Sequence, residues 1–164
     1  MSKIEIISKS DFIISFATIL EENIDIKNAI FEAVKNGSDF VYMHPIDNAD
    51  LKSSYSQFIK YEVGSEEGIC ALLLDALVKN CDESTKNFID NLDLGYISAE
   101  SSAGEEEFEE VYENSLEAKS KTIIIGNDLL EHERIENIIK LLALIKKYSD
   151  FNLLLFNFSI DRIN

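Results

Sequence analysis

Five short apolar runs along the chain are typical of strands that are buried on both faces. They cover residues 11–17 (DFIISFA), 39–45 (DFVYMHP), 58–63 (FIKYEV), 121–128 (KTIIIGND) and 151–156 (FNLLLF). Continuous apolar strands are characteristic of parallel sheets, because helices cover both faces of such sheets. The pattern therefore predicts a mostly parallel sheet.

Apolar residues at helical spacing separate these runs. They indicate helices at residues 26–34, 69–77, 104–116 and 135–145. Gly37 supplies a C-terminal stop for the first helix, and the helix at 69–77 is apolar nearly all round, which predicts deep packing. Strands that alternate with helices favour an α/β three-layer sandwich of the Rossmann type, with helices on both faces of the sheet.

The middle of the chain is less regular. Residues 80–103 are predicted to form an irregular connector, with a short helix at 84–91 and the segment GYISAESSAG as a linker. No amphipathic pattern follows the last strand, so we expect that strand to lack a covering helix. The whole of 1–164 is interpreted as one α/β domain, and as an incomplete one.

Composition and charge restrict the partners. The 164 residues carry a formal net charge of −16, which repels nucleic-acid phosphate and anionic membranes. The apolar runs are too short to span a bilayer, and the first residues lack the apolar core of a signal peptide. These features predict a cytoplasmic protein with neither nucleic-acid binding nor membrane insertion.

Candidate binding residues follow the predicted strands. In an open parallel sheet, ligands bind in the crevice beyond the carboxyl ends of the strands. The residues expected in this crevice are Thr18, His44, Gly64, Ser65, Asn127 and Asp128, and four acidic residues are expected nearby, Asp47, Asp50, Glu66 and Glu67.

The glycine loop VGSEEG, residues 63–68, has two interpretations. As a helix start, Ser65 is a good N-cap, and Glu66 and Glu67 complement the positive helix end. As a phosphate loop, it would bring an anionic ligand against the same two carboxylates, and its spacing is GxxxG rather than GxGxxG. The helix start is favoured, and a nucleotide site stays open as an alternative.

The other reactive residue types give no convincing site. His44 and His132 are the only histidines and lie far apart in the sequence, so we expect structural roles, with His44 satisfying local backbone groups. Cys70 and Cys81 lack CxxC spacing, and Cys70 is expected to be a buried thiol. The acidic run GEEEFEEVYE is interpreted as a solvated helix start. The sequence predicts no catalytic residue and no metal site.

Three segments in order carry a resemblance to a known family. They are SKSDFIISFATIL, AVKNGSDFVYMHPIDNADL and IKYEVGSEEGICALLLDAL, which follow the order of a molybdopterin oxidoreductase core. Two later segments, GYISAESSAGEEEFEE and the stretch from IIIGNDLLEHER to NLLLF, more specifically resemble the large peripheral iron–sulfur subunit of NADH-quinone oxidoreductase, respiratory complex I. The resemblance spans about residues 4–156.

The resemblance implies a scaffold rather than a catalyst. The large iron–sulfur subunit carries its clusters in an amino-terminal region and generally lacks the molybdenum cofactor, so the resemblance implies no cofactor in this chain and a vestigial crevice. It also implies other peripheral-arm subunits of complex I as partners, and a cytoplasmic location peripheral to the inner membrane. Two alternatives stay open: an oxidoreductase domain that retains a molybdopterin guanine dinucleotide, and a nucleotide-binding regulator.

Overall fold

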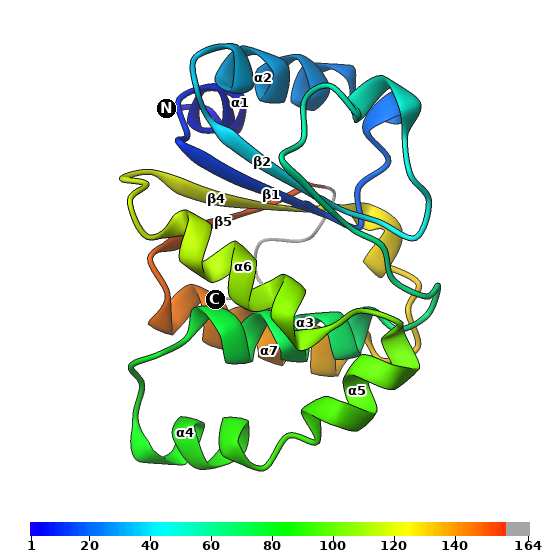
Figure 1. Cartoon of the computed structure of the whole chain (residues 1–164), viewed down its shortest axis with the longest axis vertical. Helices are drawn as coiled ribbons and strands as arrows, with labels where there is room; N and C mark the ends of the chain where they lie inside the picture. The colour runs from blue at the N-terminus through cyan, green and yellow to red at the C-terminus, as the bar shows by residue number, and fades with distance from the viewer. Residues whose placement is uncertain (157–164) are drawn as a thin grey trace.

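The computed structural model describes residues 1–156, and within them five parallel strands form one sheet in the order β3–β2–β1–β4–β5 (Figure 1). The strands are β1 (Phe12–Phe16), β2 (Asp39–Met43), β3 (Gln57–Ile59), β4 (Lys121–Ile125) and β5 (Phe151–Leu155). The predicted parallel sheet is confirmed, although β3 is shorter than the apolar run that predicted it.

Helices cover both faces of the sheet. The helices are α1 (Lys3–Ser8), α2 (Ile24–Lys35), α3 (Glu66–Leu77), α4 (Glu83–Asp90), α5 (Leu94–Ser101), α6 (Glu105–Ser115) and α7 (Ile135–Tyr148). Figure 1 shows α1 and α2 on one side, α3, α6 and α7 on the other, and α4 and α5 farther out beyond α3. The predicted three-layer α/β fold is confirmed.

Alternating side chains of the strands divide the core into two clusters. On β1, Phe12, Ile14 and Phe16 belong to the cluster that contains α3, α6 and α7, whereas Ile13 belongs to the cluster that contains α1 and α2. Helix α3 is buried along nine of its twelve residues, because the sheet, α5, α6 and α7 surround it. The prediction of a deeply packed helix at 69–77 is therefore confirmed.

The prediction of an irregular connector at 80–103 is wrong, because this segment contains the helices α4 and α5. The short helix predicted at 84–91 corresponds to α4, but the segment interpreted as a linker contains most of α5. Asp93 caps α5 by accepting a hydrogen bond from the backbone N–H of Tyr96 at 3.1 Å. The sequence hid this helix because its apolar residues lack a helical period.

The expectation that β5 lacks a covering helix is also wrong. Helix α1, which the apolar pattern did not indicate, begins with a capping box between Ser2 and Glu5. The Lys3 ammonium of α1 donates a hydrogen bond to the Leu155 carbonyl at the end of β5 and lies 5.2 Å from the ring centroid of Phe156. Six-residue helices have too little periodicity to stand out in a sequence, so tertiary packing decides them.

The strand order fixes where a ligand would bind in this topology. The chain runs from β1 to β2 and β3 on one side of the sheet, and then returns to β4 and β5 on the other. Strand order therefore reverses between β1 and β4, where sheets of this kind open a crevice beyond the carboxyl ends of the strands. The carboxyl ends are Phe16 and Ile125, which are paired in register.

Candidate functional site

The crevice between β1 and β4 is closed by the backbone of the chain itself. The N–H of Gly126 donates to the Phe16 carbonyl at 3.0 Å, and the N–H of Asp128 donates to the Ala17 carbonyl at 3.4 Å. A Cβ atom at Gly126 would lie 2.1 Å from the Ala17 carbonyl oxygen and 2.5 Å from Thr18 Oγ1. Only glycine permits this contact, which brings the two loops together at the ends of β1 and β4.

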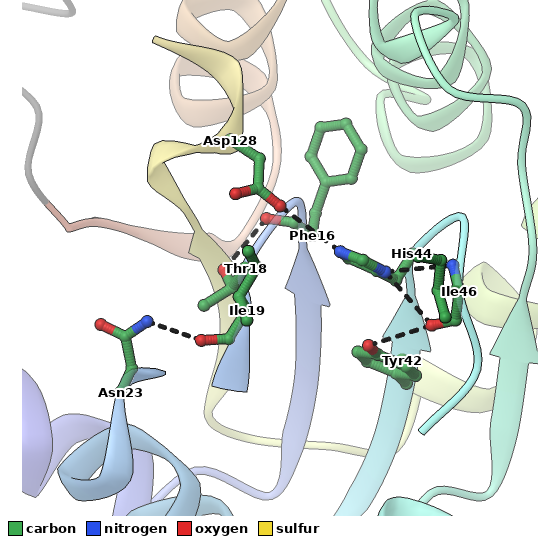
Figure 2. A network of polar contacts seen from close by, with 8 residues as sticks. All are labelled: Phe16, Thr18, Ile19, Asn23, Tyr42, His44, Ile46 and Asp128. Atoms are coloured by element: carbon green, nitrogen blue, oxygen red, sulfur yellow. Dashed lines mark hydrogen bonds and ion pairs between the residues drawn. The ribbon is translucent and has the colours of Figure 1, made fainter. Parts of the chain in front are cut away.

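The turn after β1 reinforces this closure. Ala17 has a φ of 54°, a left-handed conformation that non-glycine residues adopt rarely. Thr18 follows and is buried, with its hydroxyl donating to the Phe16 carbonyl at 3.2 Å (Figure 2). The hydroxyl expected to face a ligand is therefore directed toward its own strand.

A histidine–aspartate contact spans the crevice from β2 to the loop after β4. His44 Nε2 lies 3.4 Å from Asp128 Oδ2, and Nδ1 accepts a hydrogen bond from the backbone N–H of Ile46 at 3.1 Å (Figure 2). The Ile46 carbonyl accepts from the Tyr42 hydroxyl at 3.3 Å. The same Nδ1 also lies 3.1 Å from the Ile46 carbonyl oxygen, so Nδ1 contacts both polar backbone groups of Ile46. The expectation that His44 satisfies local backbone groups is confirmed.

The loop after β4, residues 126–134, also reaches the start of α3, and we call it the strap. His132 Nε2 donates to the Gly64 carbonyl at 2.9 Å, and Nδ1 accepts from the Arg134 backbone N–H at 2.9 Å. Glu66 Oε2 lies 3.3 Å from the same Nε2 but accepts no hydrogen bond, because the ring N–H is directed at Gly64. In the neutral ring of His132, these contacts place the proton on Nε2.

A second pair of contacts fixes the strap to α3. The Arg134 guanidinium lies 3.0 Å from Glu67 Oε2, and the Asn137 amide donates to Glu67 Oε1 at 3.2 Å. The carboxylates of the glycine loop thus bind side chains of the strap and of α7. This role of His132 and Arg134 was not predicted, although the run EHER directly after a predicted strand was an available signal.

The glycine loop starts a helix, as predicted, but its cap differs. Ser65 occupies the N-cap position of α3, yet its hydroxyl donates to the Glu62 carbonyl at 2.6 Å and accepts no hydrogen bond from the helix. The predicted side-chain cap is therefore wrong. Gly64 adopts a φ of 89°, which a side chain would strain, and Glu66 and Glu67 occupy the first helical turn as expected.

Burial and nearby carboxylates shift two tyrosines at this edge in the same direction. Burial is the larger cause of the raised pKa of the Tyr42 hydroxyl, and the carboxylates of Glu21, Asp47 and Asp128 raise this pKa further. Burial likewise raises the pKa of Tyr61, followed by the charge of Glu66. Negative charge near the ends of the strands therefore adds to the effect of burial.

The structure brings only part of the predicted set together. Thr18, His44, Asn127 and Asp128 follow the three neighbouring strands β1, β2 and β4, while Gly64 and Ser65 join them through the strap. Asp47 and Asp50 belong to a different network in the loop after β2. There Asp47 accepts a hydrogen bond from the Tyr55 hydroxyl at 3.2 Å, and Asp50 lies 3.6 Å from the Lys27 ammonium.

The cysteines lie away from this edge. Cys70 is fully buried in α3, as predicted, and this burial raises the pKa of its thiol. Cys81 is half-buried before α4. Within residues 1–156, no group of three or more histidine, cysteine or acidic side chains converges as metal ligands would.

A hollow of about 940 Å³ lies beside the glycine loop, and we call it the lateral groove. Side chains from α3, α4, α5 and α7 line it, including Ala71, Phe88, Tyr96 and Leu141. It lies on the helical side of the molecule rather than between β1 and β4. The groove was not predicted from the sequence, because it depends on how α4 and α5 pack.

No model of a known protein family matches this sequence, and no curated protein matches it significantly. In the described part of the chain, none of the helices combines the length and the apolar character that a bilayer span requires.

Proposed function

We propose that the chain is a non-catalytic interaction and scaffold module that resembles part of the large peripheral iron–sulfur subunit of NADH-quinone oxidoreductase. One observation supports the proposal: the loops after β1 and β4 contact each other directly at the edge where sheets of this topology bind dinucleotides. Gly126 packs directly on Ala17 and Thr18, and His44 and Asp128 lie across the same edge.

The charges around the edge support the same conclusion. A pyrophosphate about 5 Å from the carboxylate of Asp128 or Glu66 would be repelled by about 1–3 kcal/mol per charge pair, depending on exposure. Opening the site would also require the strap to lose the contacts of His132 and Arg134. A ligand with an anionic linkage would have to offset both costs.

The resemblance defines the proposed setting. The parent complex transfers electrons from NADH to quinone, and its iron–sulfur clusters would belong to other parts of that assembly. The partners of this chain would be other peripheral-arm subunits, on the cytoplasmic side of the inner membrane. The exposed apolar side chains of the lateral groove offer a contact surface for such a role.

A redox assay tests the proposal. The purified chain is mixed with NADH and a ferricyanide acceptor, with an active preparation of complete NADH-quinone oxidoreductase as the positive control. We expect acceptor reduction at the rate of the protein-free blank. Enzyme-dependent reduction that scales with the concentration of the chain would refute the proposal.

The strand order favours a second candidate, an oxidoreductase domain that binds a molybdopterin guanine dinucleotide at the switch point. Heat denaturation of the purified protein followed by fluorescence of the supernatant separates the two candidates, because an oxidised pterin has a distinctive emission. A stoichiometric pterin signal would favour the second candidate.

The alternative that the chain is a nucleotide-binding regulator is tested by measuring its melting temperature with and without nucleotides. Ligand at a hundredfold excess over its Kd would stabilise the fold by about 2.7 kcal/mol. An unchanged melting temperature with each common nucleotide removes this alternative.

A further inference from the structure

The lateral groove gathers exposed apolar side chains that the fold leaves uncovered. Among residues 1–156, eight large apolar residues are exposed, and three of them, Val63, Phe88 and Tyr96, line this one groove. Phe88 is 46% exposed and Tyr96 is 63% exposed. Exposed apolar side chains that gather at one groove offer a contact surface to a partner, whereas single exposed apolar residues are ordinary.

The walls of the groove are helices held in fixed positions. Helices α3 and α7 pack against each other, and α5 packs on α3 at Gly68, where a Cβ atom would lie 3.0 Å from Ile97 Cγ2. The Asn137 amide of α7 donates a hydrogen bond to Glu67 at the start of α3. The apolar surface is therefore built into the scaffold.

The shape favours a helix over a small molecule. Sites for small ligands usually bury about 70–90% of the ligand surface, which requires an enclosed pocket. Here the two aromatic residues at the rim, Phe88 and Tyr96, are 46% and 63% exposed, so the groove is open along its side. Open apolar grooves between helices accept the apolar face of an amphipathic helix.

The charge of the groove wall predicts the charge on the polar face of the bound helix. The segment 82–101, which contains α4 and α5, carries five acidic residues and one basic residue, Lys86. Lys86 is already paired with Asp90 at 2.8 Å. At the rim, Glu62 and Glu100 have no ion-pair partner among residues 1–156. Lys140 is the basic residue of the opposite wall.

We infer that the lateral groove binds an amphipathic helix of a partner protein, with leucine-like residues on its apolar face and lysine or arginine on its polar face. The apolar face would contact Ala71, Phe88, Leu92, Tyr96, Leu141 and Leu144. The basic residues would lie beside Glu62 and Glu100. This inference rests on the proposed interaction function and names the chemistry of the partner.

Three synthetic peptides of equal length test the inference. The first is a leucine/lysine peptide with helical amphipathic spacing, the second is the same composition scrambled, and the third replaces lysine with glutamate. Each is labelled with fluorescein and titrated with the full chain by anisotropy. We expect binding of the first peptide, with weaker binding of the other two.

Two pairs of variants locate the binding. F88A/Y96A truncates two rim aromatics, and its control I24A/I46A truncates two exposed apolar residues outside the groove. Loss of two aromatic anchors should raise the Kd of the first peptide about tenfold or more, while the Kd of the control variant stays within about twofold of the parent. E62Q/E100Q should weaken binding more than D25N/E32Q, which removes two charges from α2.

The outcomes separate the alternatives. Equal weakening by groove and control variants would mean general charge attraction and would overturn the inference, as would tighter binding of the glutamate peptide. Self-association of the chain that F88A/Y96A abolishes would assign the groove to a second copy instead. A pterin released by heat would overturn the proposed function, whereas peptide binding outside the groove with no pterin would overturn only this inference.

Discussion

The two histidines share one local arrangement, although they lie far apart in the sequence. In each, Nδ1 accepts the backbone N–H of the residue two positions later, Ile46 for His44 and Arg134 for His132. In each, Nε2 faces a carboxylate, Asp128 or Glu66. At His132 the Gly64 carbonyl can only accept and the Arg134 N–H can only donate, so the geometry selects the Nε2–H tautomer of the neutral ring. At His44 the ring Nδ1 also contacts the Ile46 carbonyl, so either tautomer satisfies a backbone group.

The tautomer of His132 is directly measurable. In ¹⁵N-labelled protein at a pH where the rings are neutral, long-range proton–nitrogen correlations should place the proton of the His132 ring on Nε2. The H44A and H132A variants assign the two sets of signals. A dominant Nδ1–H form of His132 would contradict the geometry of its contacts.

Gly126 is the residue on which closure of the crevice depends. A methyl group at this position would meet backbone atoms of Ala17 and Thr18 that cannot move independently of β1. We expect G126A to lower the free energy of unfolding by about 1–3 kcal/mol, the usual cost of overpacking. Urea unfolding followed by circular dichroism measures it.

G95A is the matched control for this prediction. The nearest atom to a Cβ at Gly95 is Asp93 Oδ1 at 3.9 Å, and Gly95 lies in α5, where alanine is favoured by about 0.5–1 kcal/mol. G95A should therefore be neutral or stabilising. If both variants lose stability equally, the packing at Gly126 is not the cause.

Asp82 should contribute to the pH dependence of stability. Hydrogen bonds from Thr85, and then from the Tyr148 hydroxyl at 2.8 Å, lower the pKa of Asp82 to about 2. Because the folded pKa lies below the ordinary value, this contribution is full above about pH 4 and is lost as the pH falls toward about 2.

Melting temperatures at about pH 7 and about pH 3 test this assignment, because the contribution is partly lost between them. The drop in melting temperature should be smaller in D82N than in the parent, and Y148F should lie between the two. An identical drop in all three proteins would contradict the assignment.

For single residues, the sequence predicted which side chains lie at the edge of the sheet better than it predicted their directions. The positions of Thr18, His44, Asn127 and Asp128 followed from the rule that the loops after parallel strands meet at one edge of the sheet. The direction of the Ser65 hydroxyl did not follow, because it depends on the backbone of Glu62 rather than on residue type. The partners of His132 at the start of α3 lie more than sixty positions away, and no local pattern encodes them.

Among the elements, the strap has the clearest testable role. It connects the end of β4 to α7 and is fixed to α3 by His132 and Arg134. We expect H132A to accelerate amide hydrogen exchange in residues 126–134 without changing the exchange of α2, because the lost contacts are local.

E131A provides the comparison for this experiment. Glu131 is an exposed neighbour on the strap, and its loss should leave exchange unchanged. Equal exchange in H132A and the parent would mean that the His132 contacts do not hold the strap.

Strands and long helices were predictable because their apolar residues recur at a clear spacing over an ordinary element length. Helices α1 and α5 were not, for different reasons. Helix α1 has only six residues, and α5 mixes apolar and small polar residues around its whole circumference. Helix α1 packs chiefly against α2 and α5 packs against α3, and this long-range information is absent from a local pattern.

For the whole molecule, the core should protect one thiol and expose the other. Cys70 is completely buried within α3, and burial raises the pKa of its thiol, so it should react only after unfolding. Cys81 is half-buried and should react in the native protein. Ellman's reagent should therefore titrate one thiol before guanidinium is added and two afterwards.

C81S is the control for the thiol assay. It should show no reaction in the native state and one thiol after unfolding. Rapid native labelling of C81S would mean that the core opens far more readily than its packing indicates.

The loops after β1 and β4 contact each other at the switch point of the sheet, and the proposed function requires that this edge is closed to nucleotides. The most direct test is a ¹H–¹⁵N NMR titration of the full chain with GDP in large molar excess, read at the amides of Ala17, Thr18 and Gly126. The closed edge predicts that these signals stay at their starting positions. Saturable shifts confined to these amides would show an open nucleotide site and would contradict the closure.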